Sequence, residues 1–257
     1  MMGKLCAWLK LPYIPILHGG NLPQRLEQSP KLCKPLFHRA LVNVSPSLYL
    51  KEAFNTQGFD KVVYIPNILT IKKYPYKQRP INTIKLFWLR SFSKIYNPLL
   101  AVKVLKMLLE KGFESELIMI GPDTDGSLKQ IKTFTKDHDL KVRFTGKLSK
   151  REWITQSEHY NIFINTSNYD NTPVSVMEAM ALGLPVVSTN VGGMPYLIED
   201  RKEGLLVNPD DVEAMVKAII ELHQNQDLVK TLTSNARQKV EQLDWEVVKH
   251  LWFEVLK

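Results

Sequence analysis

A regular alternation of short apolar runs and helical segments from Ile84 onward constrains the fold most strongly. The apolar runs have strand length and are nearly continuous, as expected for strands that are buried on both faces of a parallel sheet. Short connections and intervening helices are typical of βαβ units, so we predict an α/β fold with a mostly parallel sheet. The predicted strands are Ile84–Leu89, Glu116–Ile120, Lys141–Phe144, Ile162–Asn165, Pro185–Ser188 and Leu205–Val207, and the helices between them are Pro98–Leu109, Ser127–Asp137, Ser149–His159 and Val174–Leu182.

The first third of the chain is less regular, and it is followed by a basic segment, residues 72–80, that holds two prolines and is typical of a linker. We therefore predict a partial domain with its linker in residues 1–80 and a complete domain in residues 81–257. Three strands are few for a doubly wound domain, so we also expect a segment before the first residue to be missing. These predicted strands are Tyr13–Leu17, Leu41–Val44 and Lys61–Ile65, and helices are predicted at Pro35–Arg39, at Leu48–Thr56 and, as two or three helices, after Asp210.

The net charge of +8 is concentrated in the first third. Residues 1–83 contain 12 Lys and Arg against 3 Asp and Glu, whereas residues 84–257 contain 22 against 23. A basic surface attracts phosphates of an anionic lipid or of a phosphorylated acceptor, although a solvated lysine-rich face without a specific partner is an equal alternative. The chain has no aromatic-interleaved basic motif of a nucleic-acid module, so we expect no nucleic-acid partner.

The apolar pattern predicts no membrane span, because no window approaches eighteen uninterrupted apolar residues. The opening segment to Leu17 is interrupted by two lysines and two prolines, unlike a signal peptide. The two cysteines, Cys6 and Cys33, stand in no metal-ligand spacing and fit a reducing compartment. We therefore expect a cytoplasmic protein, with peripheral contact at the inner face of a membrane as a further hypothesis.

The most specific stretch runs from Asn165 to Pro185 and reads N-T-S-N-Y-D-N-T-P-V-S-V-M-E-A-M-A-L-G-L-P. It places a polar loop between a predicted strand and a predicted helix. Thr172 suits an N-cap and Pro173 suits the first helical position, so we predict that the helix begins there. Free amide groups at the positive end of a helix form a binding site for a diphosphate.

Two carboxylates flank this predicted helix start. Asp170 lies in the loop and Glu178 in the second helical turn, eight positions later. Both can face the crevice at the carboxyl ends of the strands, where open α/β sheets bind ligands. A carboxylate accepts hydrogen bonds from neighbouring hydroxyl groups, so these residues are candidates for binding sugar or ribose.

The stretch resembles the signature of retaining GT-B glycosyltransferases, family four in particular, which reads E-G-x-P-x-x-x-x-E-A-M-A-x-G-x-P-V. Here the sequence is D-N-T-P-V-S-V-M-E-A-M-A-L-G-L-P-V, so Asp170 replaces the first glutamate. The resemblance covers about residues 13 to 250. It implies a GT-B fold with one complete Rossmann-like C-terminal domain, preceded here by a partial Rossmann-like N-terminal domain.

Carried over by position, the resemblance implies that Glu178 holds the ribose hydroxyls of a donor nucleotide and that Asp170 contacts the donor sugar. The backbone of Asn171 and Thr172 is expected to meet the sugar or the diphosphate. The strand and turn K-V-R-F-T-G, which ends at Gly146, resembles the segment whose backbone lies against the nucleobase.

Three further positions follow from the same resemblance. The family uses an Arg and a Lys after a strand to grip the diphosphate, and here L-F-W-L-R-S-F-S-K supplies Arg90 and Lys94, the lysine one position early. A planar guanidinium at a strand end matches phosphate geometry. His18, followed by two glycines, corresponds to a first-domain histidine near the reacting sugar, although a satisfied polar residue is the alternative. We expect His18, Arg90 and Asp170 to be catalytic.

Asp123 and Asp125 form a D-x-D pattern that superficially matches the metal site of the other major glycosyltransferase fold. The pattern follows a strand in a loop that GT-B enzymes do not use for metal, so we expect neither a metal site nor a cofactor.

The resemblance implies a retaining hexosyltransferase that moves a sugar from a UDP-sugar or GDP-sugar to a saccharide or lipid-linked acceptor. One alternative is a truncated remnant that binds nucleotide-sugar without transferring it, or that is completed by a separate chain or by self-association. Another is a nucleotide-binding α/β protein of unrelated function.

Overall fold

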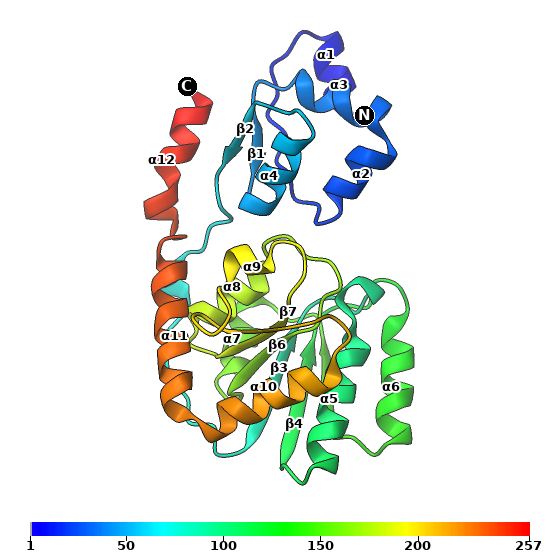
Figure 1. Cartoon of the computed structure of the whole chain (residues 1–257), viewed down its shortest axis with the longest axis vertical. Helices are drawn as coiled ribbons and strands as arrows, with labels where there is room; N and C mark the ends of the chain where they lie inside the picture. The colour runs from blue at the N-terminus through cyan, green and yellow to red at the C-terminus, as the bar shows by residue number, and fades with distance from the viewer. Residues whose placement is uncertain (1) are drawn as a thin grey trace.

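The computed structural model describes residues 2–257 and contains two parallel sheets (Figure 1). The larger sheet has six strands in the order β5-β4-β3-β6-β7-β8, and every neighbouring pair is parallel. The prediction of a mostly parallel sheet from Ile84 onward is confirmed. Its strands are β3 (Ile84–Leu89), β4 (Ser115–Ile120), β5 (Val142–Gly146), β6 (Ile162–Asn165), β7 (Val186–Thr189) and β8 (Leu205–Val207).

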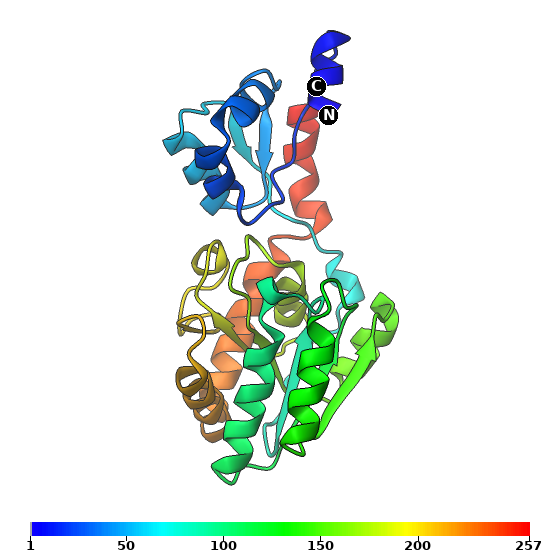
Figure 2. The same cartoon turned by 90° about the vertical axis from the view of Figure 1, so that its right-hand side faces the viewer.

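Helices cover both faces of this sheet, as Figure 2 shows from the side. The covering helices are α5 (Pro98–Glu110), α6 (Ser127–Asp137), α7 (Lys150–Ser157), α8 (Val174–Ala181), α9 (Met194–Leu197), α10 (Val212–Gln224) and α11 (Gln226–Glu241). We call residues 81–243 the large region.

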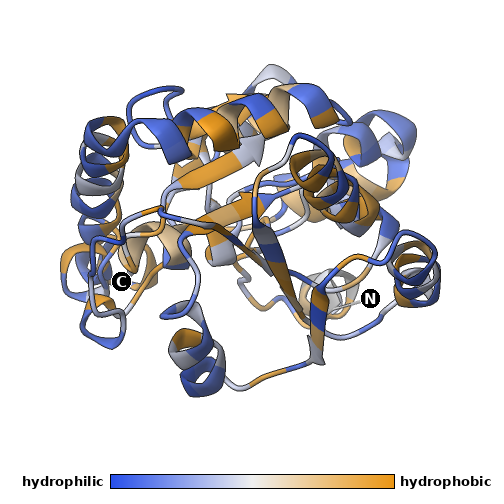
Figure 3. Cartoon of the chain, turned by 90° about the horizontal axis from the view of Figure 1, so that it is seen from below, coloured by the Kyte–Doolittle hydropathy of each residue, from blue (hydrophilic) through white to orange (hydrophobic). Residues whose placement is uncertain are grey.

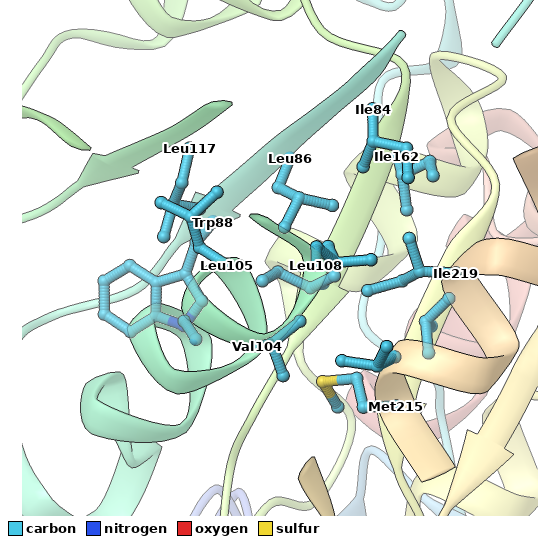
Figure 4. Close-up of a cluster of buried hydrophobic side chains, with 14 of the residues drawn as sticks. Ile84, Leu86, Trp88, Val104, Leu105, Leu108, Leu117, Ile162, Met215 and Ile219 are labelled. Carbon is cyan, nitrogen blue, oxygen red and sulfur yellow. The ribbon is translucent and has the colours of Figure 1, made fainter. Parts of the chain in front are cut away.

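The apolar side chains of β3 divide between two cores because successive residues of a strand point to opposite faces. Leu86 and Trp88 are buried in a core with α5, α6 and α10, whereas Phe87 lies in a second core with α7, α8 and α9. Figure 4 shows the first core, in which Leu86 lies near Leu108 of α5 and Ile219 of α10. Burying each such side chain contributes roughly 1.5–3 kcal/mol, so the sheet is stabilised from both sides.

The helices present one apolar side to these cores and a polar side outward. In Figure 3 the strands of the large sheet are mainly hydrophobic, whereas the surrounding helices carry both hydrophobic and hydrophilic residues. Helix α11 runs along the edge of both cores, because Val229 and Leu232 lie in the first and Ala236 and Val240 in the second.

The smaller sheet pairs β1 (Asn43–Ser45) with β2 (Val62–Tyr64) in parallel. We call residues 2–66 the small region. The predicted strand Tyr13–Leu17 is wrong: this segment makes only an isolated bridge, between Ile16 and Val44. Pro15 lacks an amide hydrogen, which limits pairing along the segment. The helices of the small region are α1 (Met2–Trp8), α2 (Leu22–Gln28), α3 (Pro30–His38) and α4 (Leu48–Thr56).

The final helix, α12 (Trp245–Leu256), leaves the large region and packs beside β1 and β2 (Figure 1). Val248 is buried against Val44 and Ile65. The linker, residues 67–80, contains the short helix η1 (Ile71–Lys73) and leads from the small region to the large one. It passes the start of α12, where the chain returns from the large region to the small one (Figure 1). The amide of Leu69 donates to Leu243, and the amide of Trp245 donates to Leu69. The division of the chain near residue 80 remains a prediction.

Candidate functional site

The strand order reverses between β3 and β6, and this reversal positions a cavity. Chains that leave neighbouring strands at such a point go to opposite faces of the sheet and open a crevice at the carboxyl ends. A cavity of about 290 Å³ lies there, lined by residues that follow β3, β4 and β5 and by α8. A larger hollow of about 720 Å³ lies between α5 and α10 and holds none of the predicted site residues. The smaller cavity is lined by Leu89, Arg90, Ser91, Tyr96, Ile120, Gly121, Pro122, Lys147, Leu148, Trp153, Ser175 and Glu178.

Arg90 leaves the end of β3 and its side chain is largely buried, with 14% exposed. It lies over the ring of Tyr96 at 4.3 Å and forms an ion pair with Asp170. Burial lowers the pKa of Arg90 to about 10, so the guanidinium stays charged at neutral pH. Gly121 makes this placement possible, because a Cβ there would collide with the carbonyl of Arg90 and its φ of +152° disfavours other residues.

The turn after β7 contacts the loop that carries Asp170 and holds its backbone in place. The amide of Gly193 donates to the carbonyl of Asp170 at 3.1 Å. At Gly192, φ is +53° and a Cβ would collide with the same carbonyl oxygen, so the two segments approach as closely as glycine allows. The Asp170 side chain pairs with Arg90, and only 11% of this side chain is exposed.

The predicted N-cap, Thr172, is wrong by one residue, whereas the predicted helical segment from Val174 agrees with the structure. Helix α8 begins at Val174, and Pro173 stands at the N-cap with an extended backbone and no side-chain capping bond. The hydroxyl of Thr172 does not cap the helix, because it donates to the carbonyl of Pro46 in the small region. The first amide groups of α8 still lack helical acceptors, as in any helix, and they lie at its positive end.

The residues after Asp170 also connect the two regions. Asn171 is buried, and its side-chain oxygen accepts a hydrogen bond from the hydroxyl of Ser47. Asn67 in the linker donates to the carbonyl of Thr172 at 3.0 Å. Loop residues 170–172 therefore lie between the cavity of the large region and the small region.

Glu178 lines the cavity and is only 5% exposed. Its Oε1 accepts hydrogen bonds from the Tyr74 hydroxyl at 2.7 Å and from Lys150 Nζ at 2.6 Å. A buried carboxylate is costly unless it is paired, and these donors pair it. Neither Tyr74 nor Lys150 was predicted from the sequence. One available signal was Lys150 itself, since a cation in the first turn of a helix opposes the helix dipole and needs a nearby anion.

Ser175 lines the cavity and was also not predicted from the sequence. It is 9% exposed, and within residues 2–257 the structure gives its hydroxyl no hydrogen-bond partner. Buried hydroxyls are normally paired, so this one is a candidate to bind a ligand in the cavity. The spacing in the sequence was a usable signal, because Ser175 precedes Glu178 by three residues and lies on the same side of α8.

The structure brings Arg90, Asp170 and Glu178 together but places two other candidates elsewhere. His18 is exposed and lines a separate cavity of about 400 Å³ beside α12, with Pro66 and Trp252. Lys94 is exposed at the start of the short helix η2 (Lys94–Tyr96) and does not line the Arg90 cavity. Gly146 ends β5, next to Lys147 of the cavity. The roles assigned to all of these residues remain predictions.

The D-x-D segment is occupied by turn contacts. Asp123 accepts from the amide of Gly126, and Asp125 accepts from the amides of Lys94 and Ser127. Hydrogen bonds, first from Ser127 and then from the Lys94 amide, lower the pKa of Asp125 to about 2. Within residues 2–257 no group of three or more His, Cys, Asp and Glu is arranged to hold a metal ion.

Among the helices of residues 2–257, none is both long enough and apolar enough to cross a bilayer.

Comparison with characterised proteins gives partial matches of moderate identity. The chain is 31% identical over 150 residues to sulfoquinovosyl transferase of Arabidopsis thaliana, covering 56% of this chain and 28% of that protein. It is 33% identical over 150 residues to the amylovoran biosynthesis glycosyltransferase AmsK of Erwinia amylovora, covering 55% of this chain and 36% of that protein. The matches thus span about a third of these relatives.

Solved structures share the fold over practically the whole chain. The Anabaena protein HepE, in complex with UDP and glucose, superposes with a TM-score of 0.88 at 18% identity, covering 99% of this chain and 74% of that one. Sucrose-phosphate synthase from Thermosynechococcus elongatus gives a TM-score of 0.84 at 19% identity, covering 99% and 70%. The predicted GT-B fold with Rossmann-like sheets is thereby confirmed.

The family described as glycosyl transferases group 1 matches residues 77–239, which is more than half of the chain and includes the whole cavity. This segment contains Arg90, Asp170, Ser175 and Glu178. The chain therefore belongs to the glycosyl transferases group 1 family.

Proposed function

We propose that the chain transfers a sugar from a nucleoside diphosphate sugar to an acceptor, with retention at the anomeric carbon, and that the Arg90–Glu178 cavity holds the donor. The observation that carries this proposal is the set of groups around that cavity: a charged guanidinium, an unpartnered buried hydroxyl and a buried carboxylate. A volume of about 290 Å³ is at the lower end of the range of small-molecule sites.

Each group has a role that its chemistry supports. Arg90 offers a charged fork to the diphosphate, and Ser175 with the first amides of α8 offers neutral donors to the same group. Glu178 accepts hydrogen bonds from ribose hydroxyls. Arg90, Ser175 and the amides of α8 stabilise the negative charge that develops on the departing diphosphate. We assign no covalent nucleophile.

Donor binding has to compete with an ion pair inside the protein. Arg90 is already paired with Asp170. A diphosphate that approaches Arg90 repels the Asp170 carboxylate and releases it toward the hydroxyls of the donor sugar. Both carboxylates of the signature would then contact the donor, Glu178 at the ribose and Asp170 at the sugar. Gly146 would pack against the base. His18 keeps its predicted role only if the two regions move on binding, and Lys94 only if its exposed side chain turns toward the cavity.

Calorimetric titration with UDP and with GDP tests the donor site, and hydrolysis of the corresponding donor sugars tests its chemistry. We expect binding of one nucleotide in the micromolar range and a loss of at least tenfold in Glu178→Gln, since a charged acceptor is removed. Glu203→Gln is the matched control, because Glu203 is 6% exposed, pairs with Lys239 and does not line the cavity.

Failure of the folded wild-type chain to bind either nucleotide would refute the donor site. Retention is checked separately, by determining with NMR the anomeric configuration of the first product formed. An inverted product would contradict the stereochemical part of the proposal alone.

For the acceptor, we propose a saccharide or lipid-linked intermediate and a cytoplasmic protein that contacts the inner face of a membrane. Support comes from the basic first third and from exposed apolar side chains there, such as Trp8 at 78% and Leu32 at 66%. Basic residues attract anionic lipid, and exposed aromatic residues suit the membrane interface. Sedimentation with phosphatidylglycerol vesicles at low salt tests this, and equal binding to phosphatidylcholine vesicles would refute it.

The alternative is a chain that binds nucleotide-sugar without transferring it. The position of His18 in a separate cavity favours it, because that residue is predicted to lie near the reacting sugar. Nucleotide binding without hydrolysis of any donor sugar, and without transfer to lipid or saccharide acceptors, would support this alternative.

A further inference from the structure

Tyr74 connects the linker to the donor cavity. It belongs to the segment between the two regions, yet its side chain is only 3% exposed and reaches Glu178. Its hydroxyl donates to Glu178 Oε1, while Lys150 donates both to this oxygen and, at 2.9 Å, to the Tyr74 hydroxyl. The three groups form a closed triangle in which one carboxylate oxygen accepts two hydrogen bonds.

Because of this triangle, the two carboxylate oxygens of Glu178 differ in their hydrogen bonds. The structure describes two donors at Oε1 and, within residues 2–257, none at Oε2. Because the carboxylate lines the cavity, its second oxygen is the one available to a ligand. A carboxylate oxygen without a donor is an acceptor only, so its partner must be a hydroxyl or another hydrogen-bond donor.

The protein holds Tyr74 firmly in place. Arg237 of α11 donates to the carbonyl of Tyr74 at 2.9 Å and to the carbonyl of Ala181, the last residue of α8, at 2.6 Å. The Tyr74 ring lies beside Trp153, with ring centres 6.3 Å apart. Burial, more than the neighbouring groups, raises the pKa of Tyr74 to about 12, so the hydroxyl keeps its proton and donates it toward Glu178.

Lys150 stands where a cation is unfavourable unless it is paired. It is the first residue of α7, after Ser149, and the hydrogen bonds of Ser149 and Glu152 form a capping box that fixes this helix start. The positive end of the helix dipole repels its ammonium group. Burial lowers the pKa of Lys150, but the hydrogen bonds to Glu178 and Tyr74 outweigh burial and the net pKa is raised. Glu178, together with Glu152 in the same first turn, offsets this repulsion at the half-exposed ammonium group.

We propose that Tyr74 and Lys150 are positioning residues that occupy Oε1 of Glu178 and thereby direct Oε2 to a single hydroxyl of the ligand, which makes the cavity selective for a ribonucleotide over its deoxy counterpart. The proposal rests on the proposed function, because it takes the ligand to be a nucleoside diphosphate. It assigns a specificity role to residues outside the signature stretch, one of them in the linker.

The test compares how the full chain binds UDP, GDP and their 2′-deoxy and 3′-deoxy counterparts in calorimetric titrations. For the wild type we expect the ribonucleotide to bind roughly tenfold to hundredfold more tightly than one of its deoxy forms, as for a hydrogen bond to a charged group. In Tyr74→Phe and in Lys150→Gln this ratio should fall below about threefold, with most of the loss on the ribonucleotide.

The control variant is Tyr76→Phe, which makes the same change two residues along the linker. The Tyr76 hydroxyl faces Thr233 at 3.4 Å and does not touch Glu178. We expect Tyr76→Phe to keep the wild-type ratio. Circular dichroism and thermal unfolding of each variant show whether it is folded.

The outcomes separate the two proposals. A wild type that binds no nucleotide removes the donor site itself. If the wild type binds with discrimination but Tyr74→Phe and Lys150→Gln keep the same ratio, or lower the affinity for both forms equally, then only the positioning role is refuted. A selective loss for the ribonucleotide in both variants, with the ratio unchanged in Tyr76→Phe, supports it.

Discussion

The large and small regions are both built from parallel strands and helices, but they complete their cores differently. The six strands of the large region are covered on both faces by helices from the same stretch of chain. The two strands of the small region are covered on one side by α4 and its neighbours and on the other by α12, which arrives from the far end of the chain. The comparison indicates that the Arg90–Glu178 cavity rests on a sheet covered by helices of its own region, whereas the small region depends on a distant segment.

Core truncations in the two regions should have the largest effects on the free energy of unfolding. They should differ in how much of the chain unfolds. Leu86→Ala in β3 should lower the free energy of unfolding by about 2–5 kcal/mol and abolish nucleotide binding when it unfolds the large region. Phe54→Ala in α4 removes a side chain that is also fully buried, but the loss should be confined to the small region. Urea unfolding with hydrogen exchange measures both effects. Uniform loss of protection in Phe54→Ala would show that the regions unfold as one unit.

Detaching α12 should have a smaller and more selective effect. Val248 is 2% exposed between α12 and the small sheet, so Val248→Asp buries a charge and should destabilise this contact by on the order of 3 kcal/mol. We expect faster hydrogen exchange in β1 and β2, with nucleotide affinity within about twofold of wild type. Val247→Asp, at a neighbouring residue that is 43% exposed, is the matched control. A comparable loss in both variants would contradict the role of the buried contact.

The contact between Tyr196 and Glu52 should contribute least. The Tyr196 hydroxyl donates to Glu52 across the two regions at 2.5 Å, but the side chain is 39% exposed, so solvent screens the interaction. We expect Tyr196→Phe to lower stability by less than about 1 kcal/mol.

The pH dependence of this small effect has a definite sign. The hydrogen bond to Glu52 raises the pKa of Tyr196, so its contribution is present below pH 10 and is lost as the pH rises through the raised value. The difference between wild type and Tyr196→Phe, measured by urea unfolding, should therefore disappear in strongly alkaline buffer. A difference of the same size and sign that persists there would contradict a contribution from the protonated Tyr196 hydroxyl.

Much of the fold was predictable because buried parallel strands have a distinctive composition. The residues of β3, β6 and β8 are apolar runs bounded by polar loops, and their predicted bounds match the structure. The segment Tyr13–Leu17 has the same apolar character, but composition does not report whether a partner strand lies beside it. The packing of α12 was not predictable either, since the apolar side of a helix looks the same whichever surface covers it.

The candidate site was predictable where its residues lie in one stretch of sequence. Asp170 and Glu178 belong to a continuous pattern, and Arg90 follows a recognisable strand. Tyr74 and Lys150 meet Glu178 from positions 104 and 28 residues away, so no local pattern connects them. Their roles come from tertiary contacts that a single sequence does not display.

The position of α12 also has a consequence for how the protein is made. A ribosome releases the small region first, and its strands β1 and β2 emerge before any part of the six-stranded sheet. The apolar surface that includes Val44 and Ile65 then stays open to water until α12 is synthesised, after the whole large region. During that interval the nascent chain exposes an apolar surface beside two paired strands, and such a surface favours aggregation.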